Sequence, residues 1–239
     1  MLLFLLSPQF RLIVMALVPA LILLVRVYRA DRIEKEPASL LISLVLYGFI
    51  SAGIAIVLET IGMSVIDNFY EKDTREYNLV LYFAVVGGSE ELSKYLMLHR
   101  RTWRSRDFNC QFDGVVYSTF VSLGFAAIEN VKYVLNFGFA TALVRAVTAV
   151  PGHACFGVFM GVWYGVAKRY YSSGKRGCSL FFRLLSLAVP VFAHGLYDYS
   201  VSYENSGIPF FAVVAVIFIL AFLSVRKASK NDTYIDGQY

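Results

Sequence analysis

Six ionisable residues lie inside stretches that are otherwise apolar enough for lipid: Glu90, Glu91, Glu129, His153, His194 and Asp198. Placing a charged side chain at the centre of a membrane costs ~2.5–3.5 kcal/mol or more, so such residues normally mark a function. Carboxylates and imidazoles gathered at membrane depth can move protons or activate a water molecule. These residues therefore predict a functional site within the membrane.

The segment GSEELSK (88–94) contains a pair of glutamates followed by a lysine. Glu90 and Lys94 are four residues apart and Glu91 and Lys94 are three apart, so on a helix Lys94 can pair with either carboxylate. One ammonium neutralises only one of the two, and the other is left to be protonated, to bind a cation or to act as a base. A buried ion pair that only fixes helix packing is the alternative, but such pairs are weak stabilisers.

The two histidines of the set differ in their neighbours. His194 and Asp198 are four residues apart and share a helix face, so Asp198 can fix the tautomer of the imidazole and raise its basicity. His153 follows a Pro-Gly pair, which can open a helix locally. On its own, His153 is more often a hydrogen-bonded packing residue. Its assignment to a functional site depends on the other five ionisable residues.

Several known catalytic motifs are absent from the sequence. It has no HExxH zinc-protease motif, no GxGD pairing, no nucleotide-binding loop, and no Gly-x-Ser element with a plausible histidine partner. The chemistry that remains is water activated by a glutamate, with histidines or a metal stabilising the developing negative charge.

The composition indicates an integral membrane protein. Of 239 residues 58% are hydrophobic and 16% are charged, and the mean hydropathy is +0.60, whereas a soluble domain carries about 25% charge. The net charge of +5 does not indicate a nucleic-acid partner, because the basic residues lie in short loops between apolar stretches. No structural disulfide is expected from Cys110, Cys155 and Cys178, which we place in cytoplasmic loops or within a span.

A transmembrane helix needs about 20 apolar residues. Seven stretches meet this length, at roughly 8–28, 38–62, 78–99, 113–136, 139–168, 180–202 and 207–226. The prediction is an all-α, polytopic membrane helix bundle of about seven transmembrane helices. It forms a single domain over 1–239, with a disordered tail at 228–239. The first stretch is predicted to be a retained span, because Arg26 and Arg29 follow it and no charged segment precedes it.

Smaller features of the spans predict packing and anchoring. Gly157, Gly161 and Gly165 recur every four residues, a pattern that lets another helix approach closely. Glu59, Asp113 and Arg145 lie near span ends, where interface anchoring accounts for them.

Taken in order along the chain, the polar motifs resemble a known family. Glu90-Glu91-x-x-Lys94, Phe125-x-x-x-Glu129, His153 and His194-x-x-x-Asp198 on successive spans are similar to the PrsW family of bacterial intramembrane proteases. That family belongs to the superfamily of the CAAX prenyl endopeptidases and the bacteriocin-immunity proteases. Residues 31–41 and 112–133 also resemble the family pattern, so the resemblance covers nearly the whole chain.

The resemblance implies a multi-pass protease of the bacterial cell membrane that acts in stress responses. It would make the site-1 cut in a single-pass membrane protein, typically an anti-sigma factor, on the extracytoplasmic side. A second protease then releases the sigma factor. By position, the active-site residues would be Glu90, Glu91, Glu129, His153 and His194, supported by Lys94, Asn130 and Asp198. The prenyl endopeptidase branch has a histidine where this chain has Glu129, so that branch's mechanism cannot be copied whole.

Two versions of the chemistry remain open. In the metal-free version, one glutamate of the pair is the general base, and His153 and His194 stabilise the oxyanion. In the metal version, Glu129, His153 and His194 are three zinc ligands that leave one position open.

Two other functional classes also fit the residues. A proton- or cation-coupled transporter would use them as a relay and would show flux into proteoliposomes. A seven-span receptor would use them as a structural polar network and would tolerate Glu90→Gln in everything except stability.

Loop charges predict the orientation of the chain. Basic residues gather at 26–37, 100–106 and 168–176 and at the start of the C-terminal tail, whereas the loop at 62–77 carries four acidic and two basic residues. By the positive-inside rule the N-terminus is outside and the C-terminus is cytoplasmic. Reporter fusions should give a cytoplasmic signal at 100–110 and an external signal at 62–77. A cytoplasmic signal from 62–77 would overturn this orientation.

Overall fold

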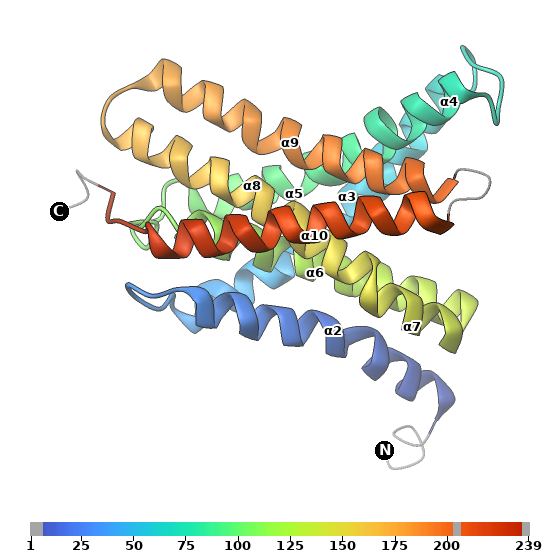
Figure 1. Ribbon diagram of the computed structural model, residues 1–239, viewed down its shortest axis with the longest axis horizontal. Coiled ribbons are helices and arrows are strands. Elements are labelled where there is room, and N and C mark those ends of the chain that lie inside the picture. Colours follow the sequence, from blue (N-terminus) through green and yellow to red (C-terminus); the bar gives the residue numbers. More distant parts are fainter. Residues whose placement is uncertain (1–6, 203–206, 236–239) are drawn as a thin grey trace.

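The computed structural model describes residues 7–202 and 207–235, which form a bundle of long helices (Figure 1). The elements are α2 (Pro8–Ala30), α3 (Ala38–Ile66), α4 (Arg75–Leu79), the π-helix η1 (Val80–Val86), α5 (Gly87–Thr102), α6 (Asp113–Phe137), α7 (Phe139–Val147), α8 (Ala149–Ser172), α9 (Arg176–Ser202) and α10 (Gly207–Lys230). This arrangement confirms the predicted all-α membrane bundle.

Among the described residues, six helical stretches are long and apolar enough to cross a membrane: Gln9–Ala30, Ala38–Ile66, Asp113–Phe137, Phe139–Ser172, Arg176–Ser202 and Gly207–Lys230. The predicted span at 78–99 corresponds to the consecutive helices α4, η1 and α5. It is less apolar than the others because α5 carries the glutamate pair and Lys94. Large apolar side chains such as Ile42 and Phe222 remain exposed on the outer helices, as lipid contact requires. The chain is a multi-pass membrane protein.

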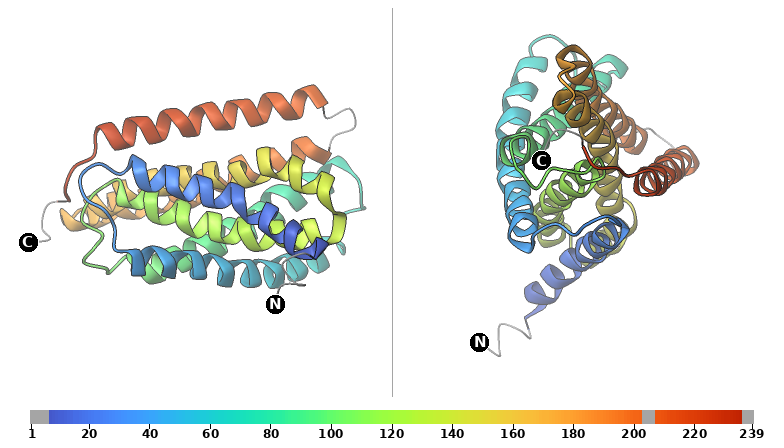
Figure 2. Two further views of the ribbon diagram at one scale, coloured as in Figure 1. Left: turned by 90° about the horizontal axis from the view of Figure 1, so that it is seen from below. Right: turned by 90° about the vertical axis from the view of Figure 1, so that its left-hand side faces the viewer.

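Helix α6 occupies the middle of the bundle and contacts α2, α3, α5, α7 and α8 (Figure 2). Every residue from Asp113 to Ala127 is buried. Helix α10 lies along the outside and packs on α8 and α9. The polar groups in this first part of α6 therefore face protein, which allows them to find partners within the membrane.

Glycines bring α8 unusually close to α6. A Cβ atom on Gly161 would lie 2.2 Å from Ser118 Oγ and 2.4 Å from the Gly114 carbonyl oxygen, and one on Gly165 would lie 2.1 Å from the Gln111 carbonyl oxygen. Only residues without a side chain permit this approach. The close packing predicted from the glycine spacing is confirmed, and α6 is the partner.

The long span predicted at 139–168 is two helices. Gly138 takes a positive φ of 81° between α6 and α7, and Thr148, with φ −120° and ψ −72°, separates α7 from α8. The break precedes Pro151, which lies in the first turn of α8, where its missing N–H removes no helical hydrogen bond. The chain therefore changes direction just before His153.

The tail predicted to be disordered at 228–239 is ordered as far as residue 235. Helix α10 continues to Lys230, Gln111 N donates to the Thr233 carbonyl at 3.1 Å, and Ile235 N donates to the Asn109 carbonyl at 2.6 Å. Composition missed this ordering because it depends on a partner segment, 103–112, which is far away in the sequence. Residues 236–239 lie outside the described part.

Replacing Gly161 tests the approach of α6 and α8. Gly161→Ala should lower the free energy of unfolding by about 1–3 kcal/mol, because the new methyl group meets backbone and hydroxyl oxygens that cannot retreat. Gly53→Ala is the matched control, since no atom lies within 4 Å of its added Cβ. Thermal unfolding in detergent measures both, and equal melting temperatures would contradict the packing.

Candidate functional site

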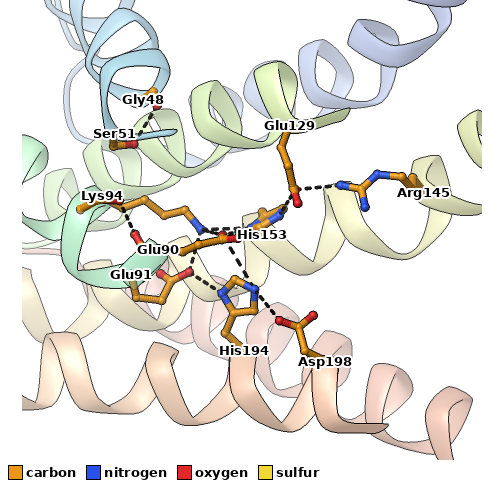
Figure 3. A network of polar contacts seen from close by, with 11 residues as sticks. Gly48, Ser51, Glu90, Glu91, Lys94, Glu129, Arg145, His153, His194 and Asp198 are labelled. Carbon is orange, nitrogen blue, oxygen red and sulfur yellow. Dashed lines mark hydrogen bonds and ion pairs between the residues drawn. The ribbon is translucent and has the colours of Figure 1, made fainter. Parts of the chain in front are cut away.

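The ammonium of Lys94 forms the centre of the polar cluster (Figure 3). Lys94 Nζ donates to Glu90 Oε2 at 3.0 Å and to Glu91 Oε1 at 2.8 Å, and lies 3.1 Å from His153 Nδ1. It also lies 4.0 Å from the centroid of the Phe125 ring, a cation–π contact. A single ammonium thus joins both glutamates of α5 to residues of α6 and α8.

The position of Lys94 determines the tautomer of His153. An ammonium has only donors, so His153 Nδ1 must accept, and the proton of a neutral ring lies on Nε2. His153 Nε2 lies 2.8 Å from Glu129 Oε2, which accepts that proton. The lone pair of Nδ1 therefore points toward the glutamate pair, and Glu129 holds the ring from its other side.

His194 faces carboxylates through both ring nitrogens. Its Nδ1 lies 2.9 Å from Glu91 Oε1, and its Nε2 lies 3.3 Å from Asp198 Oδ2 and 3.8 Å from Glu90 Oε2. The Phe156 ring stacks on the imidazole with centroids 4.6 Å apart. The predicted pairing of His194 with Asp198 is present, and Glu91 is a second partner.

Glu129 also binds a residue that the sequence assigned to interface anchoring. Arg145 Nη2 donates to Glu129 Oε2 at 2.7 Å, and Arg145 Nε donates to Asn130 Oδ1 at 2.9 Å. The interpretation of Arg145 as an interface anchor is therefore wrong. The break at Thr148 folds α7 back toward α6, and no pattern in the sequence marks that turn.

A close crossing of helices allows α5 and α9 to share this cluster. A Cβ on Gly195 would lie 2.6 Å from ring atoms of Phe83, and a Cβ on Gly87 would lie 3.2 Å from Gly195 N. The π-helix η1 ends directly before Gly87. Such wide turns are frequent at functional sites because they change the faces that the following residues present.

A pocket of about 280 Å³ opens beside the cluster. Its polar lining consists of Glu59, Tyr82, Glu90, Glu129, Lys132, Tyr133, Arg145, His153, His194, Tyr197 and Asp198. Glu90 lines the pocket, whereas Glu91, with no exposed surface, lies behind it. Glu59 was also interpreted as an interface anchor, and the structure instead places it on the pocket wall.

The donor set of the cluster suits a metal ion. Ligand atoms of Glu90, Glu91, His153 and His194 all lie within 4.8 Å of one another. Glu91 Oε2 is buried without a hydrogen-bond partner, and imidazole with carboxylate is a common zinc ligand combination. Glu129, which the sequence prediction placed among the ligands, contacts His153 from the far side and is not in this close group.

The fold and the polar cluster define a membrane-embedded protein whose side chains are of the types that hydrolysis needs. Comparison with known proteins identifies the family: residues 36–225 match the family model of PrsW family intramembrane metalloproteases. The chain is 31% identical to Protease PrsW of Clostridioides difficile, over 94% of this chain and 92% of that one. It is 30% identical to Protease PrsW of Bacillus subtilis, over 93% and 96%. No solved structure matches.

The chain belongs to the PrsW family and is a membrane peptidase. Membership in this family favours the protease over the transporter and the receptor. It confirms the family predicted from the ordered motifs.

The two glutamates should respond differently to substitution. Glu90→Gln and Glu91→Gln should each lower cleavage at least a hundredfold, since acid–base catalysis contributes ~10²–10⁴-fold. Glu91→Gln should also lower the melting temperature, because it removes a charge held between Lys94 and His194. Glu90→Gln should lower the melting temperature less, because Glu90 lines the pocket and contacts Lys94 alone at hydrogen-bond distance, at 3.0 Å. Full activity of Glu90→Gln at matched expression would contradict this assignment.

Proposed function

We propose that this protein cuts a single-pass membrane protein with a water molecule activated by Glu90. The observation that carries the proposal is the difference in access between the paired glutamates. Glu90 lines the pocket, whereas Glu91 is enclosed by Lys94 and His194. A general base must lie within reach of the proton it removes, so Glu90, the member of the pair that lines the pocket, takes this role.

The reaction proceeds by ordinary acid–base steps. The Glu90 carboxylate takes a proton from water as the water oxygen bonds to the carbonyl carbon of the scissile peptide. The protonated Glu90 then gives that proton to the leaving nitrogen as the carbon–nitrogen bond breaks. His194, with Asp198 at 3.3 Å from its Nε2, lies on the pocket wall and can donate a hydrogen bond to the developing oxyanion.

The residues that would hold a metal are Glu91, His153 and His194, with Glu90 left as the base. A bound zinc would supply Lewis-acid stabilisation of negative charge and lower the pKa of a coordinated water. Glu129 accepts a hydrogen bond from His153 Nε2, which turns Nδ1 toward the glutamates, as carboxylate partners of metal-binding histidines do. Lys94 Nζ now holds the position between these donors, so its ammonium would have to share or leave it.

The substrate is proposed to be an anti-sigma factor, cut on the extracytoplasmic side of the bacterial cell membrane. The pocket residues include the second half of α3, the second half of α6 and the last turns of α9, which lie toward one end of the bundle. The charge pattern of the loops predicts that this end is the external one. The orientation supports cleavage outside the cytoplasm, and the substrate rests on the family resemblance.

The proposal is tested with purified protein and single-pass candidate substrates in proteoliposomes, read as fragment size on a gel. The wild type and the control Glu76→Gln, which changes an exposed carboxylate in the first turn of α4, should cut, and Glu90→Gln should not. If a metal takes part, active protein should hold close to one zinc per chain by elemental analysis, and chelation should remove activity that zinc restores.

Further variants separate the possible roles. His194→Ala should lose both zinc and activity, whereas Asp198→Asn and Glu129→Gln should lower zinc affinity roughly 10–100-fold, as changes next to a ligand do. Complete zinc loss in Glu129→Gln would restore Glu129 as a ligand. Active protein with far less than stoichiometric metal would exclude the zinc version and leave the metal-free one. Absence of any fragment with every substrate tested would contradict the proposed function.

A further inference from the structure

A second cluster of buried carboxylates lies at the opposite end of the bundle from the pocket. It consists of Asp31 and Glu36, from the loop after α2, and Asp113, the first residue of α6. Their exposed fractions are 3%, 4% and 0%. One ligand atom from each of the three residues lies within 4.8 Å of the others. The peptidase site does not use these residues.

Four of the six carboxylate oxygens of this cluster have no hydrogen-bond partner within the described residues. Both carboxylate oxygens of Asp31, Oε1 of Glu36 and Oδ1 of Asp113 are buried without a hydrogen-bond partner. The nearby Lys35 directs its ammonium to the backbone carbonyls of Tyr28 and Asp31. A buried carboxylate without a partner is costly, so such oxygens indicate a ligand that completes them.

Other contacts hold the carboxylates in position. Tyr117 Oη donates to Glu36 Oε2 at 2.6 Å, and the backbone N–H groups of Asn109 and Cys110 donate to Asp113 Oδ2 at 3.0 Å and 2.7 Å. These hydrogen bonds fix the two carboxylates in position, while Glu36 Oε1 and Asp113 Oδ1 have no hydrogen-bond partner. This is a preorganised set of oxygen donors.

The local charge is unbalanced. Asp232 and Glu34 add negative charge beside Asp31, which Lys35 offsets only in part, and Asp31 and Asp107 add negative charge beside Glu36. Asp232 belongs to the tail that packs on 103–112, where its Oδ1 accepts from Phe112 N at 2.8 Å. Positive charge at this point would remove the repulsion between the segments that meet there.

We propose that Asp31, Glu36 and Asp113 bind a hard divalent cation, Mg²⁺ or Ca²⁺. These ions prefer carboxylate oxygens and water, in contrast to the imidazole-containing cluster of the peptidase site. The cation joins the loop after α2 to the start of α6, next to the ordered tail. It is separate from the metal considered for hydrolysis, and the proposal does not depend on the proposed function.

Terbium luminescence tests the site directly. Tb³⁺ is a Ca²⁺ analogue, and Tyr117, which is hydrogen-bonded to Glu36, can sensitise the luminescence of Tb³⁺. Full-length protein in detergent, stripped with chelator, should give saturable luminescence that Ca²⁺ or Mg²⁺ displaces. Asp31→Asn and Glu36→Gln should weaken binding at least about tenfold, because cation affinity depends on the number of charged ligands.

Two controls make the result specific. Glu76→Gln changes an exposed carboxylate of α4, far from the cluster, and should bind Tb³⁺ as the wild type does. His194→Ala alters the peptidase site and should keep the luminescence. No saturable signal in the wild type, or equal signals in the wild type and Asp31→Asn, would overturn the proposal.

Melting temperature provides an independent measurement that does not require Tb³⁺. Ca²⁺ or Mg²⁺ should raise the melting temperature of the wild type through mass action, and should not raise that of Asp31→Asn. Without cation, Asp31→Asn should melt at or above the wild-type temperature, because it removes repulsion. A wild type that does not respond to either cation would mean that the carboxylates share protons instead, and the proposal would be wrong.

Discussion

The site depends on the contacts made by the buried ammonium of Lys94. This ammonium contacts both carboxylates of α5, the imidazole of His153 on α8 and the ring of Phe125 on α6. Removing such a charge from water is expensive, and good geometry with several partners is needed to offset that cost. Lys94 meets this condition, because every group around its ammonium is an acceptor or an aromatic face. The same contacts direct the lone pair of His153 and bring two adjacent glutamates to one point.

These contacts are possible because glycines let the helices approach at the backbone. Gly161 and Gly165 admit α6 against α8, and Gly87 and Gly195 do the same where α5 crosses α9. Lipid offers no hydrophobic drive between helices, so close van der Waals packing has to stabilise the bundle. The polar cluster and the glycine contacts therefore depend on each other. The cluster needs the short distances between helices that the glycines allow, and the polar contacts in turn fix the register of the helices that pack at the glycines.

Buried carboxylates have different partners at the two ends of the bundle. At the pocket, each carboxylate of the cluster contacts Lys94, Arg145 or a histidine, and only Glu91 Oε2 is buried there without a partner among the described residues. At the other end Asp31, Glu36 and Asp113 keep oxygens without partners. In a chain whose composition is this apolar, a cluster of buried carboxylates costs stability, so each cluster indicates a function. One end carries the candidate peptidase site. The other contains Asp31 and Glu36, from the segment at 31–41 that is part of the family resemblance, and is the proposed cation site.

The sequence alone determined the class of fold and predicted most of the residues that the structure brings together in the candidate site. Span positions follow from local apolar composition, and an ionisable residue within a span is conspicuous wherever it lies. Tertiary structure decided the partners. Arg145 and Glu59 near span ends look like interface anchors until helix rotation and the break at Thr148 turn them inward. Glu90 and Glu91 are neighbours in sequence, but about 100° apart around a helix with 3.6 residues per turn. Only the packing of α9 and α6 makes one of them face the pocket and encloses the other, because access depends on what surrounds a side chain.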